Sequence, residues 1–354
     1  MPHILFLTEK WCDTNPDCGP TNSEHNLFGS LLASRVATFE GIHFDEYWRR
    51  YGRNADEAIL ARVQTSPRPD LVVATPIWCS SITASRDTYA AIQRMGIPIV
   101  LIAFDASNPD VRREMLDYAE VATSTVVLDL AEDELFLDPR FVPMWTPQDP
   151  RIFQDRGLER AIDVSFVGSV DQYPDRKRAI DRLRQAGIEV HHAGGQREGH
   201  LSVHDYAALF QRSRISLNFA KSVLEGPTQV KGRVFEATMC GSLLLEEDNP
   251  HVRKWLTPGV DYVPFTDPDD LAAKVEYHLK NEKERARIAR SGQRKAEKLY
   301  HARNFWKRIL ELAGLPQPVR SLSGMWKKLT SQPVGRLPTR MWQKVHEVGV
   351  RAFG

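Results

Sequence analysis

The sequence has 354 residues, of which 42% are hydrophobic and 26% are charged, and its net charge at neutral pH is +1. This length suffices for two domains with separate cores, and the composition is that of a folded globular protein. No apolar run is long enough to cross a bilayer and the N-terminus lacks a cleavable signal, so we expect a cytoplasmic protein. The four cysteines lack CxxC spacing, which argues against a zinc site or a disulfide framework.

Short apolar segments alternate with amphipathic helical patterns, which is typical of parallel α/β sheets. A helix is predicted to begin at Thr21, with Glu24 completing a capping box three residues later. Strands are predicted in the first half at 3–8, 71–75, 99–104 and 125–128. A second series is predicted at 164–167, 188–191, 215–219 and 243–245.

Two prolines, Pro143 and Pro147, interrupt this pattern and mark the predicted domain boundary. The sequence therefore predicts a Rossmann-like domain at 1–145, a second at 146–315 and a C-terminal tail at 316–354. We expect the two domains to face one another across a cleft, with ligands at the carboxyl ends of the strands. Neither GxGxxG after the first strand nor GxxxxGK[ST] occurs, which counts against a dinucleotide dehydrogenase and a P-loop ATPase.

The most informative stretch is 230–247, in which a basic loop leads into a short helix, a glycine and an apolar strand. Lys231 and Arg233 stand where the helix begins, and free backbone N–H groups and the helix dipole favour an anion there. Glu236 follows after little more than one turn and could accept hydrogen bonds from sugar hydroxyls. This combination predicts a site for a nucleotide sugar.

The same stretch resembles the donor half of GT-B glycosyltransferases, specifically the spore-maturation (CgeB-like) group. Members read Arg-x-Phe/Tyr-Glu-x-x-x-x-Gly before an apolar strand, and here Arg233, Phe235, Glu236 and Gly241 occupy those positions. The likeness covers roughly residues 163–312 and holds for the N-terminal half only in general layout. It implies a GT-B fold in which the second domain binds the donor and the first domain binds the acceptor.

The resemblance also places a donor-contacting loop at Gly168 and Ser169, with Arg176 near the following helix start. An ordinary strand-to-helix turn is the alternative for that loop. Lys231 and Arg233 would neutralise the diphosphate as it leaves. Related retaining enzymes carry a glutamate eight residues before Glu236, where this chain has Thr228, so the stereochemistry of transfer is left open.

Two residues of the first domain are candidate general bases for an acceptor hydroxyl. His25 lies in the first helix, after the loop 11–20, and Asp105 directly follows a predicted strand. The alternatives are a surface histidine at a helix start and an aspartate that caps the helix near Pro109.

No metal site or cofactor is predicted. Asp267-Pro268-Asp269 has the DxD form of metal-dependent transferases but precedes a helical pattern, so we interpret it as a helix cap. The reaction is therefore expected to be independent of divalent cations.

The tail at 316–354 carries seven basic residues against one acidic residue, Glu347, on a chain whose net charge is only +1. Its tryptophans Trp326 and Trp342 lie in amphipathic patterns. Such helices can bind an anionic membrane surface at the inner face of the membrane, and the alternative is docking onto the domains. Nucleic acid is not expected as a partner, because the rest of the chain is acidic and lacks a recognition motif.

Together these patterns predict a metal-independent glycosyltransferase of the hexosyltransferase type, active in polysaccharide biosynthesis. It would transfer a sugar from a nucleoside diphosphate sugar to a hydroxyl of a glycan, lipid-linked or protein acceptor. Two other functions stay open: a nucleotide-sugar epimerase of the same architecture, and a non-catalytic sugar-binding or assembly protein.

Overall fold

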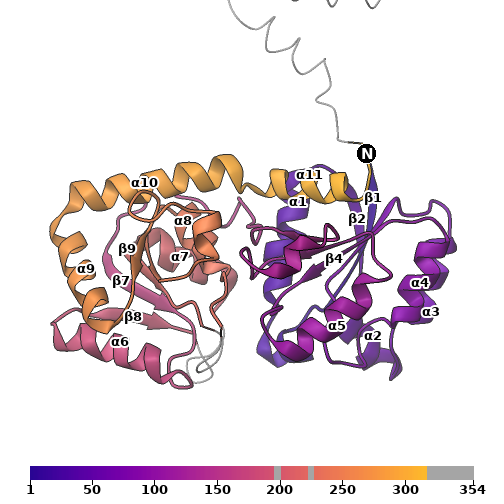
Figure 1. Cartoon of the computed structure of the whole chain (residues 1–354), viewed down its shortest axis with the longest axis horizontal. Coiled ribbons are helices and arrows are strands. Elements are labelled where there is room, and N and C mark those ends of the chain that lie inside the picture. Colours follow the sequence, from indigo (N-terminus) through magenta and orange to yellow (C-terminus); the bar gives the residue numbers. More distant parts are fainter. Residues whose placement is uncertain (195–200, 222–226, 317–354) are drawn as a thin grey trace, which may run out of the picture. The chain divides into compact units, whose positions relative to one another are not determined.

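The computed structural model describes residues 1–194, 201–221 and 227–316, and these residues form two parallel β-sheets with helices packed on them (Figure 1). The predicted fold class, two Rossmann-like α/β sheets, is confirmed. The basic tail lies almost entirely outside the described residues.

The first sheet has the strand order β2-β1-β3-β4-β5-β6, and every neighbouring pair is parallel. Its strands are β1 (His3–Thr8), β2 (Thr38–His43), β3 (Leu71–Ala74), β4 (Ile99–Ala103), β5 (Ser124–Val127) and β6 (Phe141–Pro143). The central strands β3 and β4 are buried throughout, as expected for strands covered on both faces.

The second sheet has the order β11-β10-β9-β7-β8 and is also parallel. Its strands are β7 (Ile162–Val167), β8 (Val190–Ala193), β9 (Ser213–Asn218), β10 (Leu243–Glu247) and β11 (Val263–Phe265). All eight predicted strands are present within a few residues of their expected bounds. The sequence did not predict β2, β6 and β11, each of which lies at the edge of a sheet.

Helices connect the strands, and several begin at a side chain that caps the first turn. Asn108 and Asp267 each directly precede a proline. The side chain of each accepts hydrogen bonds from two backbone N–H groups in the first turn of the helix. The interpretation of Asp267 as a helix cap is thus confirmed, whereas Asn108, not Asp105, caps the helix at Pro109. The helices are α1 (Ser30–Ser34), α2 (Phe44–Tyr51), α3 (Asp56–Gln64), α4 (Arg86–Arg94), α5 (Pro109–Ala119), α6 (Pro174–Gln185), α7 (Val203–Arg212), α8 (Arg233–Met239), α9 (Pro268–Lys280), α10 (Glu282–Leu299) and α11 (Ala302–Leu312).

The first predicted helix exists, but it is a π-helix over Glu24–Gly29 that continues into α1. The predicted capping box does not form. Thr21 Oγ1 accepts a hydrogen bond from the Ser23 N–H at 3.2 Å, while the Glu24 carboxylate lies 3.1 Å from Nε2 of His43. Glu24 therefore ties this helix to the end of β2 instead of to its own first turn.

Helix α11 completes the hydrophobic core of the first sheet although it follows the second sheet in the sequence. Phe305, Trp306 and Ile309 are fully buried there together with Ile4 and Phe6 of β1. The Trp306 Nε1–H donates to Ser30 Oγ of α1 at 2.8 Å, and Figure 1 shows α11 beside α1.

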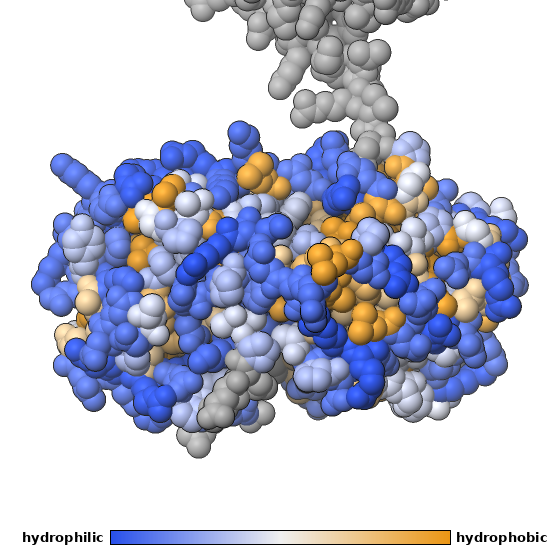
Figure 2. Space-filling model, in the orientation of Figure 1, coloured by the Kyte–Doolittle hydropathy of each residue, from blue (hydrophilic) through white to orange (hydrophobic). Residues whose placement is uncertain are grey.

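The surface is mostly hydrophilic in the view of Figure 2, with hydrophobic residues gathered in a few places. Within the described ranges, no helix is both long and apolar enough to cross a membrane.

Candidate functional site

Three basic side chains gather where strands of the second sheet end. Arg233, the first residue of α8, donates from Nη1 to the backbone oxygen of Val167 at the end of β7 and from Nε to Asn218 Oδ1 at the end of β9, the latter at 3.0 Å. These two bonds fix the guanidinium at the carboxyl edge of the sheet, which is where ligands bind in open α/β folds.

Gly168 lies directly beneath this guanidinium. Its φ of +141° is one that residues with a side chain rarely adopt, and a Cβ placed there would come within 2.5 Å of Arg233 Nη1. Because residue 168 has no side chain, the Arg233 guanidinium can lie against the backbone at this position. Its neighbour Ser169 is half-buried, and its backbone oxygen accepts from Arg176.

Arg176 is buried at the start of α6. It donates from Nη1 to the Ser169 oxygen at 3.0 Å and from Nη2 to the Lys221 oxygen at 2.5 Å, and its guanidinium lies 3.7 Å from the centre of the Tyr173 ring. Burial lowers the pKa of Arg176 to about 10, and repulsion from Arg233 acts in the same direction. Because its hydrogen bonds go to neutral carbonyl groups, its charge adds to the positive potential around Arg233.

Lys231 is the third member of this group, hereafter the basic cluster (Arg176, Lys231 and Arg233). Its Nζ donates to Gln229 Oε1 at 2.5 Å. Burial lowers the pKa of Lys231 to about 8, and the charges of Arg233 and Arg176 lower it further, while Asp105 and Asp129 oppose this. Three cations that repel one another would be stabilised by an anion placed among them.

Glu236 lies on the buried side of α8. The Tyr206 hydroxyl donates to its Oε2, and the Asn26 side chain also hydrogen bonds to the carboxylate. Burial raises the pKa of Glu236 to about 6, against the effect of these hydrogen bonds and of Arg233. The side chain predicted to contact a ribose is thus only 3% exposed and held by protein groups.

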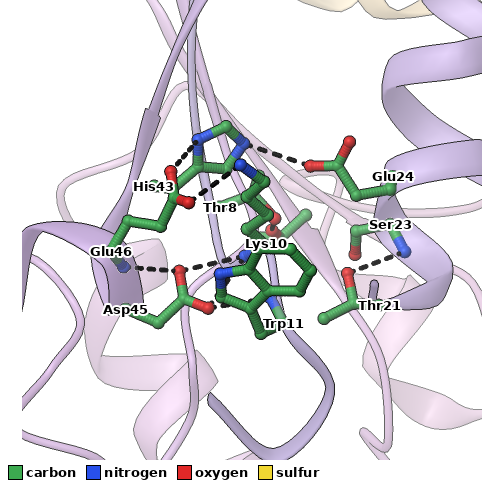
Figure 3. Close-up of polar contacts among 10 residues, drawn as sticks. Thr8, Lys10, Trp11, Thr21, Ser23, Glu24, His43, Asp45 and Glu46 are labelled. Carbon is green, nitrogen blue, oxygen red and sulfur yellow. Dashed lines mark hydrogen bonds and ion pairs between the residues drawn. The ribbon is translucent and has the colours of Figure 1, made fainter. Parts of the chain in front are cut away.

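At the carboxyl ends of β1 and β2 in the first sheet, acidic side chains are paired with basic side chains and with backbone N–H groups (Figure 3). Asp45 accepts from the backbone N–H groups of Lys10 and Trp11, at 3.0 and 2.8 Å, and Lys10 Nζ donates to Glu46 at 2.8 Å. His43 lies between Glu24 and Glu46, at 3.1 and 3.7 Å. This network holds the segment after β1 and the π-helix that carries His25.

His25 is half-buried against Phe153, with 5.7 Å between the ring centres, and its Nε2 is buried without a hydrogen-bond partner. Burial lowers its pKa to about 4, in spite of the charges of Asp149 and Glu24. The imidazole is therefore neutral at pH 7, as a general base must be, although such a low pKa makes it a weak one.

Asp105 is exposed and adopts a left-handed backbone conformation, with φ of +58°. Few residues with a side chain adopt this conformation, although aspartate does so more often than most, and such residues recur at functional turns. Because Ala103 pairs with Val127 in register, Asp105 and Asp129 follow neighbouring strands at equivalent positions.

Asp129 is a candidate that the sequence did not indicate. It is 5% exposed, and neither carboxylate oxygen has a well-aligned hydrogen-bond partner among the described residues. Burial together with Asp105 raises its pKa to about 7, against the effect of the nearby backbone N–H groups of Ala106 and Ser107. Its backbone oxygen accepts from the Val230 N–H at 2.8 Å, and Gln229 Nε2 donates to Ser107 Oγ, so the loop that carries Lys231 contacts this end of the first sheet. The only signal in the sequence was its position just after a predicted strand.

No group of three or more histidine, cysteine, aspartate or glutamate side chains in the described part of the chain is arranged to hold a metal ion.

Comparison with known proteins gives two findings. Residues 159–311 match a family model described as glycosyl transferase-like, a segment that contains the whole basic cluster. No curated protein sequence matches the chain.

Solved structures resemble the chain over nearly its whole length. Anabaena HepE in complex with UDP-glucose has a TM-score of 0.59 at 14% identity, covering 88% of this chain and 99% of that one. Sucrose-phosphate synthase of Thermosynechococcus elongatus has a TM-score of 0.54 at 9% identity, with coverages of 94% and 100%. A candidate UDP-N-acetylglucosamine 2-epimerase of Listeria monocytogenes has 0.51 at 9%, with coverages of 90% and 98%. At these identities the likeness establishes the fold, which is GT-B as predicted, while membership of the CgeB-like group stays a prediction.

Proposed function

We propose that this protein is a glycosyltransferase that moves a hexosyl group from a nucleoside diphosphate sugar to a hydroxyl group of a glycan, lipid-linked or protein acceptor. The observation that carries the proposal is the basic cluster at the carboxyl ends of β7 and β9, within the segment that matches the glycosyl transferase-like family. A second support is that HepE, which has the same fold, binds UDP-glucose.

In this proposal the basic cluster stabilises the leaving group. The bond between the anomeric carbon and the phosphate oxygen breaks with its electron pair going to the diphosphate, whose negative charge grows as it departs. Arg233 and Lys231 lie at the start of α8, and Arg176 beside them adds a third positive charge. Cations fixed in advance near a developing charge lower the barrier without any rearrangement. We propose that no divalent cation is needed.

The acceptor side uses residues of the first sheet. As the acceptor oxygen forms its bond to the anomeric carbon, its proton must go to a base. The exposed Asp105, next to Asp129, is our first candidate, and the half-buried and neutral His25, whose Nε2 is buried, is the second. The Asp105 carboxylate is accessible to an acceptor, whereas His25 would need a local opening.

One alternative is a nucleotide-sugar epimerase, which the fold also accommodates, as the Listeria neighbour illustrates. An epimerase would convert the donor in the absence of any acceptor. The other is a non-catalytic binding protein, which would bind a nucleotide sugar but never release free nucleotide. Thr228, at a position where retaining relatives carry glutamate, is the observation that favours it.

We propose that this activity is cytoplasmic and part of polysaccharide biosynthesis, with the basic tail either docked on the domains or in contact with the inner face of the membrane.

The proposed function is tested by a thermal-shift screen of the purified full-length chain against UDP-, GDP-, ADP-, CMP- and dTDP-sugars, with and without EDTA. A ligand that binds the native state raises the melting temperature by mass action. We expect stabilisation by one nucleotide family, unchanged by EDTA. Absence of any shift would contradict the transferase proposal, and a shift that EDTA abolishes would contradict its independence of metal.

A further inference from the structure

A buried carboxyl group lies directly behind the basic cluster. Glu246 stands near the end of β10 and pairs in register with Asn218, the last residue of β9. Both side chains are 0% exposed, and Asn218 Nδ2 donates to Glu246 Oε2 at 2.7 Å. A carboxyl group is costly to bury unless its surroundings use it, and neither the strand nor the core requires one here.

One set of contacts runs from Glu246 to Arg233. The amide of Asn218 can be oriented in two ways, and the bond to Glu246 selects the one that turns Oδ1 toward α8. That oxygen accepts from Arg233 Nε at 3.0 Å. Without the acceptor at Glu246, the amide would lose its fixed orientation and Arg233 would keep only its bond to the Val167 oxygen.

A second neighbour of Glu246 is Asn249, on the path to Lys231. The Asn249 side chain is also 0% exposed and lies close enough to lower the pKa of the Glu246 carboxyl group. Asn249 Nδ2 donates to the backbone oxygen of Gln229 at 2.8 Å, and Gln229 Oε1 accepts from Lys231 Nζ at 2.5 Å. The same carboxyl group thus bonds to Asn218, which holds Arg233, and lies beside Asn249, which holds the loop that carries Lys231.

We propose that Glu246 is a positioning residue, which holds Arg233 and the loop before α8 in the geometry that binds the diphosphate of a nucleotide sugar. This inference rests on the proposed function and goes beyond it, because it assigns a role to a side chain that no ligand would touch.

The protonation of Glu246 gives the proposal a signature in pH. Burial raises its pKa to about 8, and the neighbouring Glu247 raises it too, while Asn218, Asn249 and Arg233 act in the opposite direction. The Tyr262 hydroxyl also faces this group. Below that pH the side chain is a neutral acid. Above it, a negative charge appears behind Arg233 and competes with the phosphate.

Nucleotide-sugar affinity should therefore fall as pH rises through this range. Lys231, whose pKa is about 8, loses its charge in the same range and weakens binding as well. Glu246→Gln keeps the acceptor oxygen for Asn218 but cannot ionise. In this variant only the loss of charge at Lys231 should weaken nucleotide-sugar binding as the pH rises.

The test is isothermal titration of the full-length protein with UDP-glucose, GDP-glucose and ADP-glucose, followed by the variants with whichever of the three binds. At pH 7 we expect Glu246→Gln to bind within about threefold of the wild type, and Glu246→Leu, which removes the acceptor of Asn218, to bind at least about tenfold more weakly. Glu276→Leu, at an exposed position on α9, is the matched control and should bind normally. Between pH 7 and 9, affinity should fall less in Glu246→Gln than in the wild type.

Wild-type affinity in Glu246→Leu would overturn the proposal, as would an equal loss with pH in the wild type and Glu246→Gln. If Glu246→Leu does not fold, the pH profile of Glu246→Gln decides the question. Binding that is lost in Arg233→Ala but unaffected by either Glu246 substitution would overturn the positioning role alone. A wild type that binds none of the three sugars, nor any nucleotide sugar of the thermal-shift screen, would overturn the proposed function as well.

Discussion

Around β1 and β2 of the first sheet, carboxylates are matched by backbone N–H groups and by Lys10 and His43, whereas at the ends of β7 and β9 in the second sheet cations are crowded together. Both regions lie on parallel sheets of the same kind. In the first, local hydrogen bonds satisfy the charges and stabilise a loop. In the second, Arg176 and Arg233 donate to neutral oxygens and repel one another and Lys231, whose charge is supported by Asp105 and Asp129.

This difference indicates which charged groups of two similar sheets are structural and which are candidates for binding a ligand. Charges that are satisfied internally, such as Asp45, stabilise the fold. Charges that the fold holds close to like charges, such as Arg176 and Arg233, are candidates for binding an anionic ligand. The fold alone assigns no activity to either sheet, and the distinction comes from the side chains in the loops.

The largest effect should come from breaking the basic cluster. We expect Arg233→Ala to lower kcat/KM for release of nucleotide from the sugar donor that the thermal-shift screen identifies by about a thousandfold, as for the loss of a preorganised charge on a leaving group. Arg184→Ala, an exposed arginine on α6, is the control and should leave the rate unchanged. A steady-state assay of nucleotide release measures both, and near-normal turnover in Arg233→Ala would remove the donor-site assignment.

The next effect concerns the exposed carboxylate of the first sheet. Asp105→Asn should lower kcat by about a hundredfold, the contribution typical of a general base, and change nucleotide affinity far less, through its weaker support of the Lys231 charge. Asp110→Asn, on the exposed side of α5, serves as the control. The test compares kcat with the Kd from titration, and a loss of affinity with normal kcat would show that Asp105 has a different role.

A smaller effect is expected from the satisfied carboxylate near β2. Asp45→Ala leaves the N–H groups of Lys10 and Trp11 without their acceptor and should lower the free energy of unfolding by about 2 kcal/mol. Chemical denaturation measures the change, with Asp117→Ala at an exposed site of α5 as the control. Unchanged stability in Asp45→Ala would contradict its structural role.

The smallest effect concerns the buried carboxylate of α8. Tyr206→Phe removes the hydroxyl that donates to Glu236, and we expect the free energy of unfolding to fall by about 1 kcal/mol. Tyr277→Phe, on the surface of α9, should have no effect. If Tyr206→Phe proves neutral, water or another group must satisfy Glu236.

Much of the fold could be predicted because the interior strands of a parallel sheet are continuous apolar runs. The three strands that the sequence did not predict lie at the edges of the two sheets, where one side of the strand makes no hydrogen bonds to a neighbouring strand. β2 contains Glu40 and Gly41, and β6 and β11 contain Pro143 and Pro264. These residues interrupt the apolar run by which a buried strand is predicted from sequence.

The candidate site divides in a similar way. Lys231, Arg233 and Glu236 could be found because they are close together in the sequence and belong to one motif. Glu246, Asn218 and Asp129 could not, because their roles arise from strand pairing and from contacts between distant segments. Local sequence also could not show that Tyr206 would engage Glu236.

The most direct test of the central claim is a crystal structure of the full-length protein with the nucleotide sugar that the thermal-shift screen identifies. Our account predicts that the diphosphate lies within hydrogen-bond distance of Arg233 and Lys231, at the carboxyl ends of β7 and β9. A diphosphate bound elsewhere, with Arg233 still held only by Val167 and Asn218, would contradict it.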